Sequence, residues 1–446
     1  MNLVYKVNDR PKFGQLLIFA FQQLLAILAA TIAVPSIVGN GMSQSAALFG
    51  AGVGTIVYLL FTKFKSPVFL GSSFAFLGSM FAAFGGAASV SVGYAGLVIG
   101  AVFAGLVYVV IALVVKFCGV GWVSKLMPAV VIGPTVAIIG LSLAGNAIGD
   151  ALKGAALVDG TYVMNTQGWV SLVCALITLF TVIFCSIKGK KMMKLIPFII
   201  GIVAGYLCAL IFTLIGKSAG NDDLKVLNFA AFESMKWVPD FSFIKAFEGF
   251  SSIDLKYIAS IAVAYVPVAF VVFAEHIADH KNLSTIIGQD LLEEPGLHRT
   301  LLGDGIGSIA GAFFGGCPNT TYGESVGCVA ITGNASVITI LATSILAIAA
   351  SFFAPFVTFL STIPSCVMGG VCITLYGFIA VSGLKMLQPV DLNDNKNLFT
   401  ASVILIAGIG GMTLKIGAVT ITEIACALIL GIIVNLVFNR PENKTK

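Results

Sequence analysis

The sequence predicts an all-α polytopic membrane protein with about 14 transmembrane segments. Of the 446 residues, 58% are hydrophobic and only 10% are charged, whereas soluble domains carry roughly 25% charged residues. The mean hydropathy is +1.03. Apolar runs of about 20 residues, the length that crosses a bilayer as a helix, recur along almost the whole chain. The 49 glycines suit helices that pack closely in lipid.

The predicted spans follow one another with short polar connections, apart from a long connection at residues 217–256. In chain order they cover residues 14–36, 43–62, 67–84, 88–116, 124–146, 168–187, 192–216, 257–280, 299–315, 319–333, 336–357, 363–384, 397–413 and 418–438.

Basic residues predict the orientation of these spans. With the N-terminus in the cytoplasm, the even-numbered spans end inside, and lysine and arginine gather at those ends, as the positive-inside rule requires. These residues are Lys63, Lys65, Lys116, Lys125, Lys188, Lys190, Lys191, Lys194, Lys281, Arg299, Lys385, Arg440, Lys444 and Lys446. We therefore expect both termini in the cytoplasm and the segment 217–256 outside.

Similar segments in the two halves of the chain indicate an internal repeat. LMPAVVIGPTVAIIG (126–140) resembles TIPSCVMGGVCITLYG (362–377), with Pro128 matching Pro364 and a glycine five residues further on in both. Chance similarity between glycine-rich apolar sequences is the alternative. Seven spans in each half would invert the second half relative to the first, which predicts a 7+7 inverted repeat.

Spans 3 and 10 are short and broken. SPVFLGSSFAF (66–76) and CPNTTYGESVG (317–327) are both led by proline, rich in small residues, and similarly placed in each half. Paired interrupted segments of this kind point to the substrate site of a transporter near the bilayer midplane.

Two glutamates lie within apolar sequence. Glu275 is near the end of the run VAYVPVAFVVFAEHIADH, and Glu324 follows the second break. A charge at the centre of a membrane helix costs about 2.5–3.5 kcal/mol on insertion scales, so an acid there is a functional-site hypothesis. Together the two acids predict a site for a polar solute, with protons involved.

The segment 275–280 places ionisable side chains on two faces of one helix. Glu275 and Asp279 are four residues apart and share a face, as do His276 and His280. Glu275 is predicted to carry a proton, with Asp279 one turn nearer the cytoplasm. Alternatively, the membrane ends here and Asp279 is interfacial. The His-x-x-x-His spacing also permits a metal site, but no third ligand is evident, and no metal is expected.

The two breaks supply different groups to the predicted site. Proline, asparagine, threonine and glycine in 318–325 resist a regular helix start and free backbone groups that lipid cannot satisfy. A helix that begins after this break directs its positive end at the cavity, beside Glu324. The alternative is an outer loop with an N-x-T sequon. In the other break, Phe74 offers a ring for stacking on a flat solute, or simply packs in the interior.

A pyrimidine such as uracil fits these groups, because it has two ring N–H donors, two carbonyl oxygens and a flat surface. A carboxyl in a low-dielectric site can be neutral in one state and charged in another, which gives a route to proton coupling. The sequence shows no ATP-binding loop and no nucleophile set, so neither an enzyme nor an organic cofactor is expected. Gly303-Asp304-Gly305 is interpreted as close helix packing.

The chain resembles the nucleobase–cation symporter family, also called nucleobase–ascorbate transporters, and within it the bacterial uracil permeases. The resemblance runs nearly end to end, through FQQLLAILAATIAVP, LGSSFAF, AEHIADHKNL, DLLEEPGLHRTLLGDG and FFGGCPNTTYGESVGCVAITG. It implies fourteen spans in two inverted repeats. It also implies a core domain that moves against a gate domain, often in a homodimer.

The resemblance divides the chain into five parts. They are 1–120, the first part of the core (spans 1–4); 121–216, the first part of the gate (spans 5–7); 217–256, the outer loop; 257–360, the second part of the core (spans 8–11); and 361–446, the second part of the gate (spans 12–14) with the cytoplasmic tail.

The resemblance also assigns site residues. Glu275 and Glu324 become side-chain ligands of the base, and Phe74 and Gly323 supply backbone groups. Ala30, Tyr322 and Ser73 line the pocket.

Proton coupling is expected to involve Glu275, Asp279 and Glu324. Asp279 stands where one branch of the family has histidine, so the identity of the proton relay differs here. Gln23 replaces a common histidine, and Ser325 replaces the usual asparagine. Glu324, where a glutamine marks the xanthine branch, favours uracil.

The leading hypothesis is therefore a proton-coupled symporter that imports uracil across a bacterial inner membrane by alternating access. A purine permease for xanthine, urate or guanine is the alternative within the family. A passive channel or a membrane enzyme is the alternative from another class.

Overall fold

The computed structural model describes residues 3–119, 121–122, 127–416 and 419–438. Residues 124–126 of the fifth predicted span and residue 418 of the last lie outside the described residues, as do Lys125, Arg440, Lys444 and Lys446.

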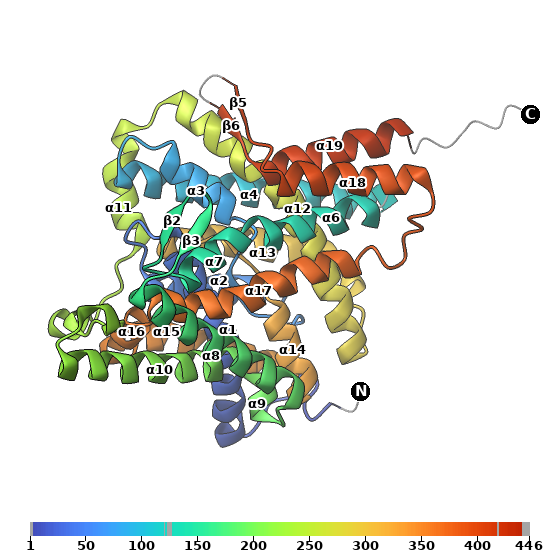
Figure 1. Ribbon diagram of the computed structural model, residues 1–446. Helices are drawn as coiled ribbons and strands as arrows, with labels where there is room; N and C mark the ends of the chain where they lie inside the picture. Colours follow the sequence, from blue (N-terminus) through green and yellow to red (C-terminus); the bar gives the residue numbers. More distant parts are fainter. Residues whose placement is uncertain (1–2, 120, 123–126, 417–418, 439–446) are drawn as a thin grey trace, which may run out of the picture.

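Helices make up most of the described chain (Figure 1). They are α1 (Phe13–Val38), α2 (Gln44–Phe61), α3 (Leu77–Gly85), α4 (Val90–Cys118), α6 (Ala129–Ser142), α7 (Ala144–Ala151), α8 (Thr166–Lys188), α9 (Met192–Leu195), α10 (Pro197–Ala219), α11 (Ser242–Gly249), α12 (Leu255–Ile287), α13 (Leu297–Gly315), α14 (Gly323–Thr332), α15 (Val337–Ser351), α16 (Ala354–Ser361), α17 (Ser365–Lys385), α18 (Asn395–Ile409) and α19 (Glu423–Phe438).

Within the described residues, three two-stranded antiparallel sheets interrupt the helices, so the expectation of an all-α chain is corrected in this detail. Their strands are β1 (Leu70–Ser72) with β4 (Asn319–Thr321), β2 (Ala156–Val158) with β3 (Thr161–Val163), and β5 (Leu414–Ile416) with β6 (Val419–Ile421).

Eight helices of the described part of the chain are long and apolar enough to cross a membrane. A ninth span results if α15 and α16, which are bent by 81° at their junction, count as one. The span predicted at 336–357 is thus a bent pair. The second helix has proline in its first turn, and because proline lacks an N–H and clashes with the preceding turn, it begins a new helix more readily than it continues one.

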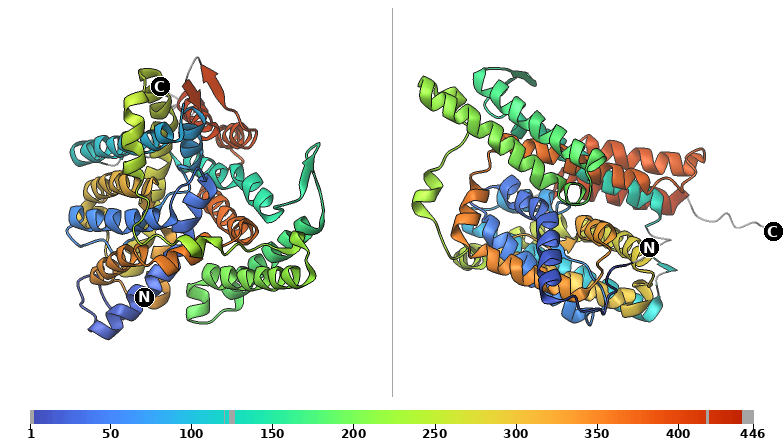
Figure 2. Two further views of the ribbon diagram at one scale, coloured as in Figure 1. Left: turned by 90° about the vertical axis from the view of Figure 1, so that its left-hand side faces the viewer. Right: turned by 90° about the horizontal axis from the view of Figure 1, so that it is seen from below.

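The helices pack in two groups (Figures 1 and 2). The first group contains α1, α2, α4, α12, α13 and α15, and the second contains α6, α7, α8, α10, α17, α18 and α19. Glycine pairs bring helices together in both. Gly54 of α2 faces Gly307 of α13, where a Cβ on either would lie 2.7 Å from the other's carbonyl oxygen. Gly133 of α6 meets Gly383 of α17 in the same way, at 2.8 and 2.5 Å. Small residues therefore set these helix contacts.

The two breaks meet in space. β1 pairs with β4, with Leu70 opposite Thr321 and Ser72 opposite Asn319. The short helices α3 and α14 then begin at Leu77 and Gly323. The prediction that segments 3 and 10 are short and broken is confirmed. Because the strands satisfy each other's backbone groups, extended chain is tolerated inside the bundle.

We call the paired strands β1 and β4 the crossing. Tyr322 packs against it. Its hydroxyl donates to the carbonyl oxygen of Ser72 at 2.8 Å. Its ring lies directly above Gly71, where an added Cβ would come within 2.2 Å of a ring carbon. A glycine is therefore required at position 71.

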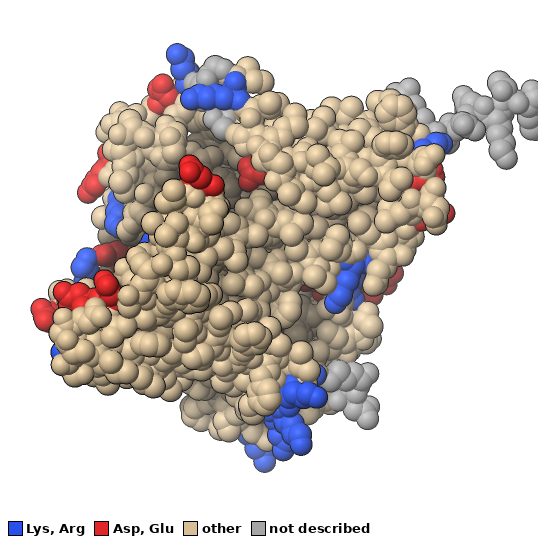
Figure 3. Space-filling model, viewed as in Figure 1, with Lys and Arg blue, Asp and Glu red and all other residues tan. Residues whose placement is uncertain are grey.

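The surface is that of a membrane protein. In Figure 3 most charged side chains lie towards the edges of the view, apart from some acidic ones further in near the top, and a broad uncharged face occupies the middle. Leu207, Ile211 and Leu214 form an exposed apolar stripe on α10. Spaced by three to four residues, they lie on one helix face, which suits contact with lipid.

Candidate functional site

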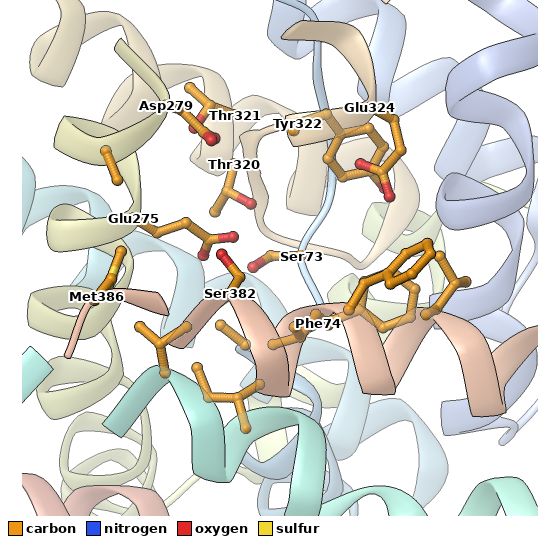
Figure 4. Close-up of a pocket in the computed structure, with 18 of the residues that line it drawn as sticks. Ser73, Phe74, Glu275, Asp279, Thr320, Thr321, Tyr322, Glu324, Ser382 and Met386 are labelled. Atoms are coloured by element: carbon orange, nitrogen blue, oxygen red, sulfur yellow. The ribbon is translucent and has the colours of Figure 1, made fainter. Parts of the chain in front are cut away.

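A cavity of about 360 Å³ lies between the two helix groups, next to the β1–β4 crossing (Figure 4). On the side of the first group and the crossing, it is lined by Ser73, Phe74, Ala75, Glu275, Ala278, Asp279, Thr320, Thr321, Tyr322, Gly323 and Glu324. On the side of the second group it is lined by Val136, Ile139, Phe198, Leu375, Phe378, Ile379, Ser382 and Met386. The polar groups thus concentrate on one wall.

α12 brings Glu275 and Asp279 to the cavity. The helix starts at the cap of Asp254, whose carboxylate accepts from the Tyr257 N–H at 2.7 Å, and runs to Ile287. It continues well beyond the predicted end at residue 280, so the acids lie within a regular helix and both line the cavity. The prediction that they share a face is confirmed. Asp279 Oδ2 also accepts a hydrogen bond from Thr321 Oγ1 at 2.8 Å.

The start of α14 brings Glu324. Tyr322 is extended, and the helix begins at Gly323, with Glu324 in its first turn. The first N–H groups of a helix have no partner within it and carry partial positive charge. Because Gly323 is exposed to the cavity, this end of the helix offers backbone donors beside an acidic acceptor.

Phe74 supplies an aromatic surface. It follows β1, lines the cavity, and packs edge-on against Tyr376 of α17, with ring centroids 6.0 Å apart. Figure 4 shows Glu275, Ser73 and Ser382 directed into a common space, with Glu324 beside Tyr322. The cavity therefore combines a flat ring, carboxyl acceptors, hydroxyls and backbone donors.

One predicted pocket residue lies elsewhere. Ala30 is 2% exposed on α1, packs in the same apolar cluster as Tyr322, and is not among the residues that line the cavity. Two positions that differ from the family pattern contact each other. Gln23 Nε2 donates to Ser325 Oγ at 2.5 Å, and Ser325 Oγ also accepts from the Phe69 N–H at 3.0 Å. They join α1 to the two breaks.

The alternative of a metal site at His276 and His280 does not fit the structure. His276 and His280 share a face, but their ring nitrogens contact Asp304, Thr300, the His276 carbonyl and Tyr58. The described residues contain no group of three or more side chains that could hold a metal ion.

Sequence reasoning missed the opposite wall of the cavity. The residues of α6, α10 and α17 there are apolar, apart from Ser382. Nothing in their composition separates them from other packed helix residues, so only the tertiary arrangement reveals them. The buried Asp304 also lies in a segment whose sequence indicates only close helix packing.

Membrane-crossing helices in two groups, with a polar cavity where two interrupted segments meet, define a transport protein. The chain belongs to the nucleobase–ascorbate transporter family: the sequence model described as "Permease family" matches residues 14–417. It is a multi-pass membrane transport protein and not an enzyme.

Curated relatives match along nearly the whole chain. The chain is 42% identical to a uracil permease of Bacillus caldolyticus over 443 residues, covering 98% of this chain and 96% of that protein. It is 38% identical to the uracil permease of Bacillus subtilis (strain 168), with the same coverage. It is 33% identical to the uracil permease of Escherichia coli (strain K12), covering 98% and 95%.

Solved structures share the fold at low sequence identity. The transmembrane domain of the cyanobacterial bicarbonate transporter BicA superposes with a TM-score of 0.64 at 16% identity, covering 97% of this chain and 99% of that one. Murine Slc26a9, an anion transporter in the inward-facing state, gives 0.65 at 12% identity, covering 96% and 69%.

Proposed function

We propose that this protein is a proton-coupled symporter that imports uracil by alternating access. The convergence of Glu275 and Glu324 on one cavity, beside the free backbone of the α14 start, carries the proposal. Each carboxylate accepts one ring N–H of the pyrimidine, and a charge-assisted hydrogen bond of this kind is about twice as strong as a neutral one. Backbone groups at Phe74 and Gly323 contact the carbonyl oxygens. The names of the relatives support the same substrate.

The acids also supply the coupling proton. Glu275, Asp279 and Glu324 line a single cavity, and like charges that share a poorly solvated site disfavour one another's ionisation. At least one of the three therefore takes up a proton when the site is closed to water. A proton that enters with the base and leaves on the cytoplasmic side couples transport to the proton gradient.

The two helix groups are proposed to be the moving parts. Residues 1–120 and 257–360 form the core with the crossing and its acids, and residues 121–216 and 361–446 form the gate. The segment 217–256 is the outer loop. A fourteen-span inverted repeat is supported by matching helix starts, because Pro128 and Pro364 directly precede α6 and α17.

The orientation follows from charge. We place both termini in the cytoplasm of a bacterium and the protein in its inner membrane, as a homodimer. The cavity-lining Ser382 and Met386 flank Lys385, one of the basic residues predicted to lie inside. The cavity of this structure is therefore the cytoplasmic half of the pathway.

Binding of labelled uracil to the purified protein tests the substrate. Excess uracil is expected to displace the label, and excess xanthine, urate or guanine is expected to leave it bound. Displacement by a purine at equal or lower concentration would instead favour the purine permease.

A further inference from the structure

A second polar cluster lies behind Glu275, inside the first helix group. It contains His276 and His280 of α12, Asp304 and Thr300 of α13, and Tyr58 of α2. Asp304 is 1% exposed and the other four side chains are fully buried, and none of the five is among the residues that line the cavity. Because a buried acid is costly in a membrane domain, Asp304 needs an explanation of its own.

The hydrogen bonds of His276 locate its hydrogen atoms. His276 Nε2 lies 2.9 Å from Thr300 Oγ1, and the Thr300 hydroxyl donates its only hydrogen to the Leu297 carbonyl at 3.0 Å. With the hydroxyl hydrogen donated to that carbonyl, the threonine oxygen accepts, and we assign the ring hydrogen to Nε2. On the other side of the ring, His276 Nδ1 lies 2.7 Å from Asp304 Oδ2. Two lone pairs would repel at this distance, so one further proton lies between these atoms.

The surroundings decide which atom holds that proton. Asp304 Oδ1 has no hydrogen-bond partner within the described residues. A buried carboxylate carries charge on both oxygens and needs partners for each, whereas a protonated carboxyl needs an acceptor only for its O–H. The other titratable groups that face His276 are Tyr108 of α4, with its ring edge-on at 6.4 Å, and the stacked ring of His280 at 4.0 Å. No lysine or arginine in the described ranges forms an ion pair with Asp304.

We propose that Asp304 is held protonated and acts as a hydrogen-bond donor to His276, which fixes the rotation of α12. A second anchor lies one turn on. His280 Nδ1–H donates to the His276 carbonyl at 2.8 Å, and His280 Nε2 lies 2.7 Å from the Tyr58 hydroxyl. Both histidines lie on the helix face away from the cavity, so these anchors turn Glu275 and Asp279 towards it. Asp304 and His276 are positioning residues, and the proton on Asp304 stays in place while those in the cavity move.

Infrared spectroscopy of the purified protein tests the protonation state without any substrate. The wild-type spectrum minus that of Asp304→Asn is expected to contain the band of a protonated carboxyl, with the shift that exchange into D₂O produces. Wild type minus Glu293→Gln is the control, because Glu293 is exposed. Loss of carboxylate bands in Asp304→Asn would overturn the assignment, because Asp304 would then be the charged partner of an imidazolium.

Uracil binding tests the positioning role, and this arm rests on the proposed function. Asp304→Asn keeps an N–H donor towards His276 Nδ1, whereas Asp304→Leu has a similar volume and no donor. Binding is expected to stay within about threefold of wild type in the first and to weaken about tenfold or more in the second, the effect of one lost buried hydrogen bond. Size-exclusion chromatography checks that both variants fold. Equal, wild-type affinity in folded Asp304→Leu would contradict the role, while the infrared result remains independent of the substrate.

Discussion

At the scale of single residues, the proposed function depends on where the carboxyl groups of Glu275, Asp279 and Glu324 lie. Glu275 and Glu324 come from segments almost fifty residues apart, yet both line one cavity. Local structure positions each of them. Glu275 lies on the face of α12 that lines the cavity, and Glu324 lies in the first turn of α14, which begins shortly after β4.

Replacing either glutamate with glutamine keeps its size and removes its charge. Glu275→Gln and Glu324→Gln are each expected to reduce uracil accumulation by about tenfold to a hundredfold, since a hydrogen bond to a charged group contributes about 1.5–3 kcal/mol. Uptake of labelled uracil into cells is the measurement. The exposed Glu293→Gln is the matched control, and wild-type accumulation in both cavity variants would contradict the assigned ligands.

Asp279 is expected to affect coupling more than binding. It is tied to Thr321 by a 2.8 Å hydrogen bond, so it is less free than Glu275 to contact the base. Asp279→Asn should retain exchange of internal for external uracil but lose most accumulation driven by a proton gradient. Exchange and accumulation are measured in the same vesicles. A parallel loss of both would assign Asp279 to substrate binding instead.

The carboxyls were predictable because a charge within an apolar run is conspicuous in sequence, and the i, i+4 spacing fixes a shared face. The pairing of Gln23 with Ser325 was not, since they lie in different segments. The apolar wall of Val136, Leu375 and Phe378 was not predictable either, because its residue types occur in every span.

At the scale of elements, the crossing of β1 and β4 is the structural centre. Pro-led, small-residue segments predicted two breaks in the helices, but hydrogen bonding between them became visible only in the structure. Strand pairing this short depends on which residues meet in space and has no periodic signal in sequence. The bend between α15 and α16 was missed because proline marks a break in an apolar run without giving its angle.

Gly71→Ala is expected to disrupt this crossing. The new Cβ would lie 2.2 Å from a carbon of the Tyr322 ring, so Tyr322 must move and its hydrogen bond to Ser72 is lost. Overpacking of this kind costs about 1–3 kcal/mol, and uracil affinity should fall because Tyr322 and Gly323 line the cavity.

Gly327→Ala is the control for that change. Gly327 lies in α14, and an added Cβ meets nothing within 4 Å. Thermal unfolding and uracil binding should therefore stay at the wild-type values, or the midpoint should rise slightly because alanine favours helix. Wild-type thermal stability and uracil affinity in both Gly71→Ala and Gly327→Ala would contradict the close packing of Tyr322 on Gly71.

At the scale of the whole molecule, the proposed alternating access requires the two helix groups to move relative to each other. The cavity has walls from both, with Ser73 beside the crossing and Ser382 on α17. Figure 4 shows both side chains directed into the space beside Glu275. A covalent link between them would join the groups.

Cross-linking therefore tests the motion. In a Ser73→Cys, Ser382→Cys double variant, a bifunctional thiol reagent is expected to stop uracil uptake, because the cavity can no longer open alternately to the two sides of the membrane. Each single variant is treated with the same reagent as a control. Its uptake shows the effect of modifying one introduced cysteine and of any reaction with the native cysteines. Uptake that survives complete cross-linking would show that the two groups do not separate during transport.

The most direct test of the account is uptake of labelled uracil into proteoliposomes that contain the purified protein, with and without an inward proton gradient. We predict accumulation above the external concentration only with the gradient, collapse of that accumulation by a protonophore, and accumulation at least about tenfold lower in Glu275→Gln. Uracil that merely equilibrates at the same rate with or without the gradient would contradict proton-coupled symport.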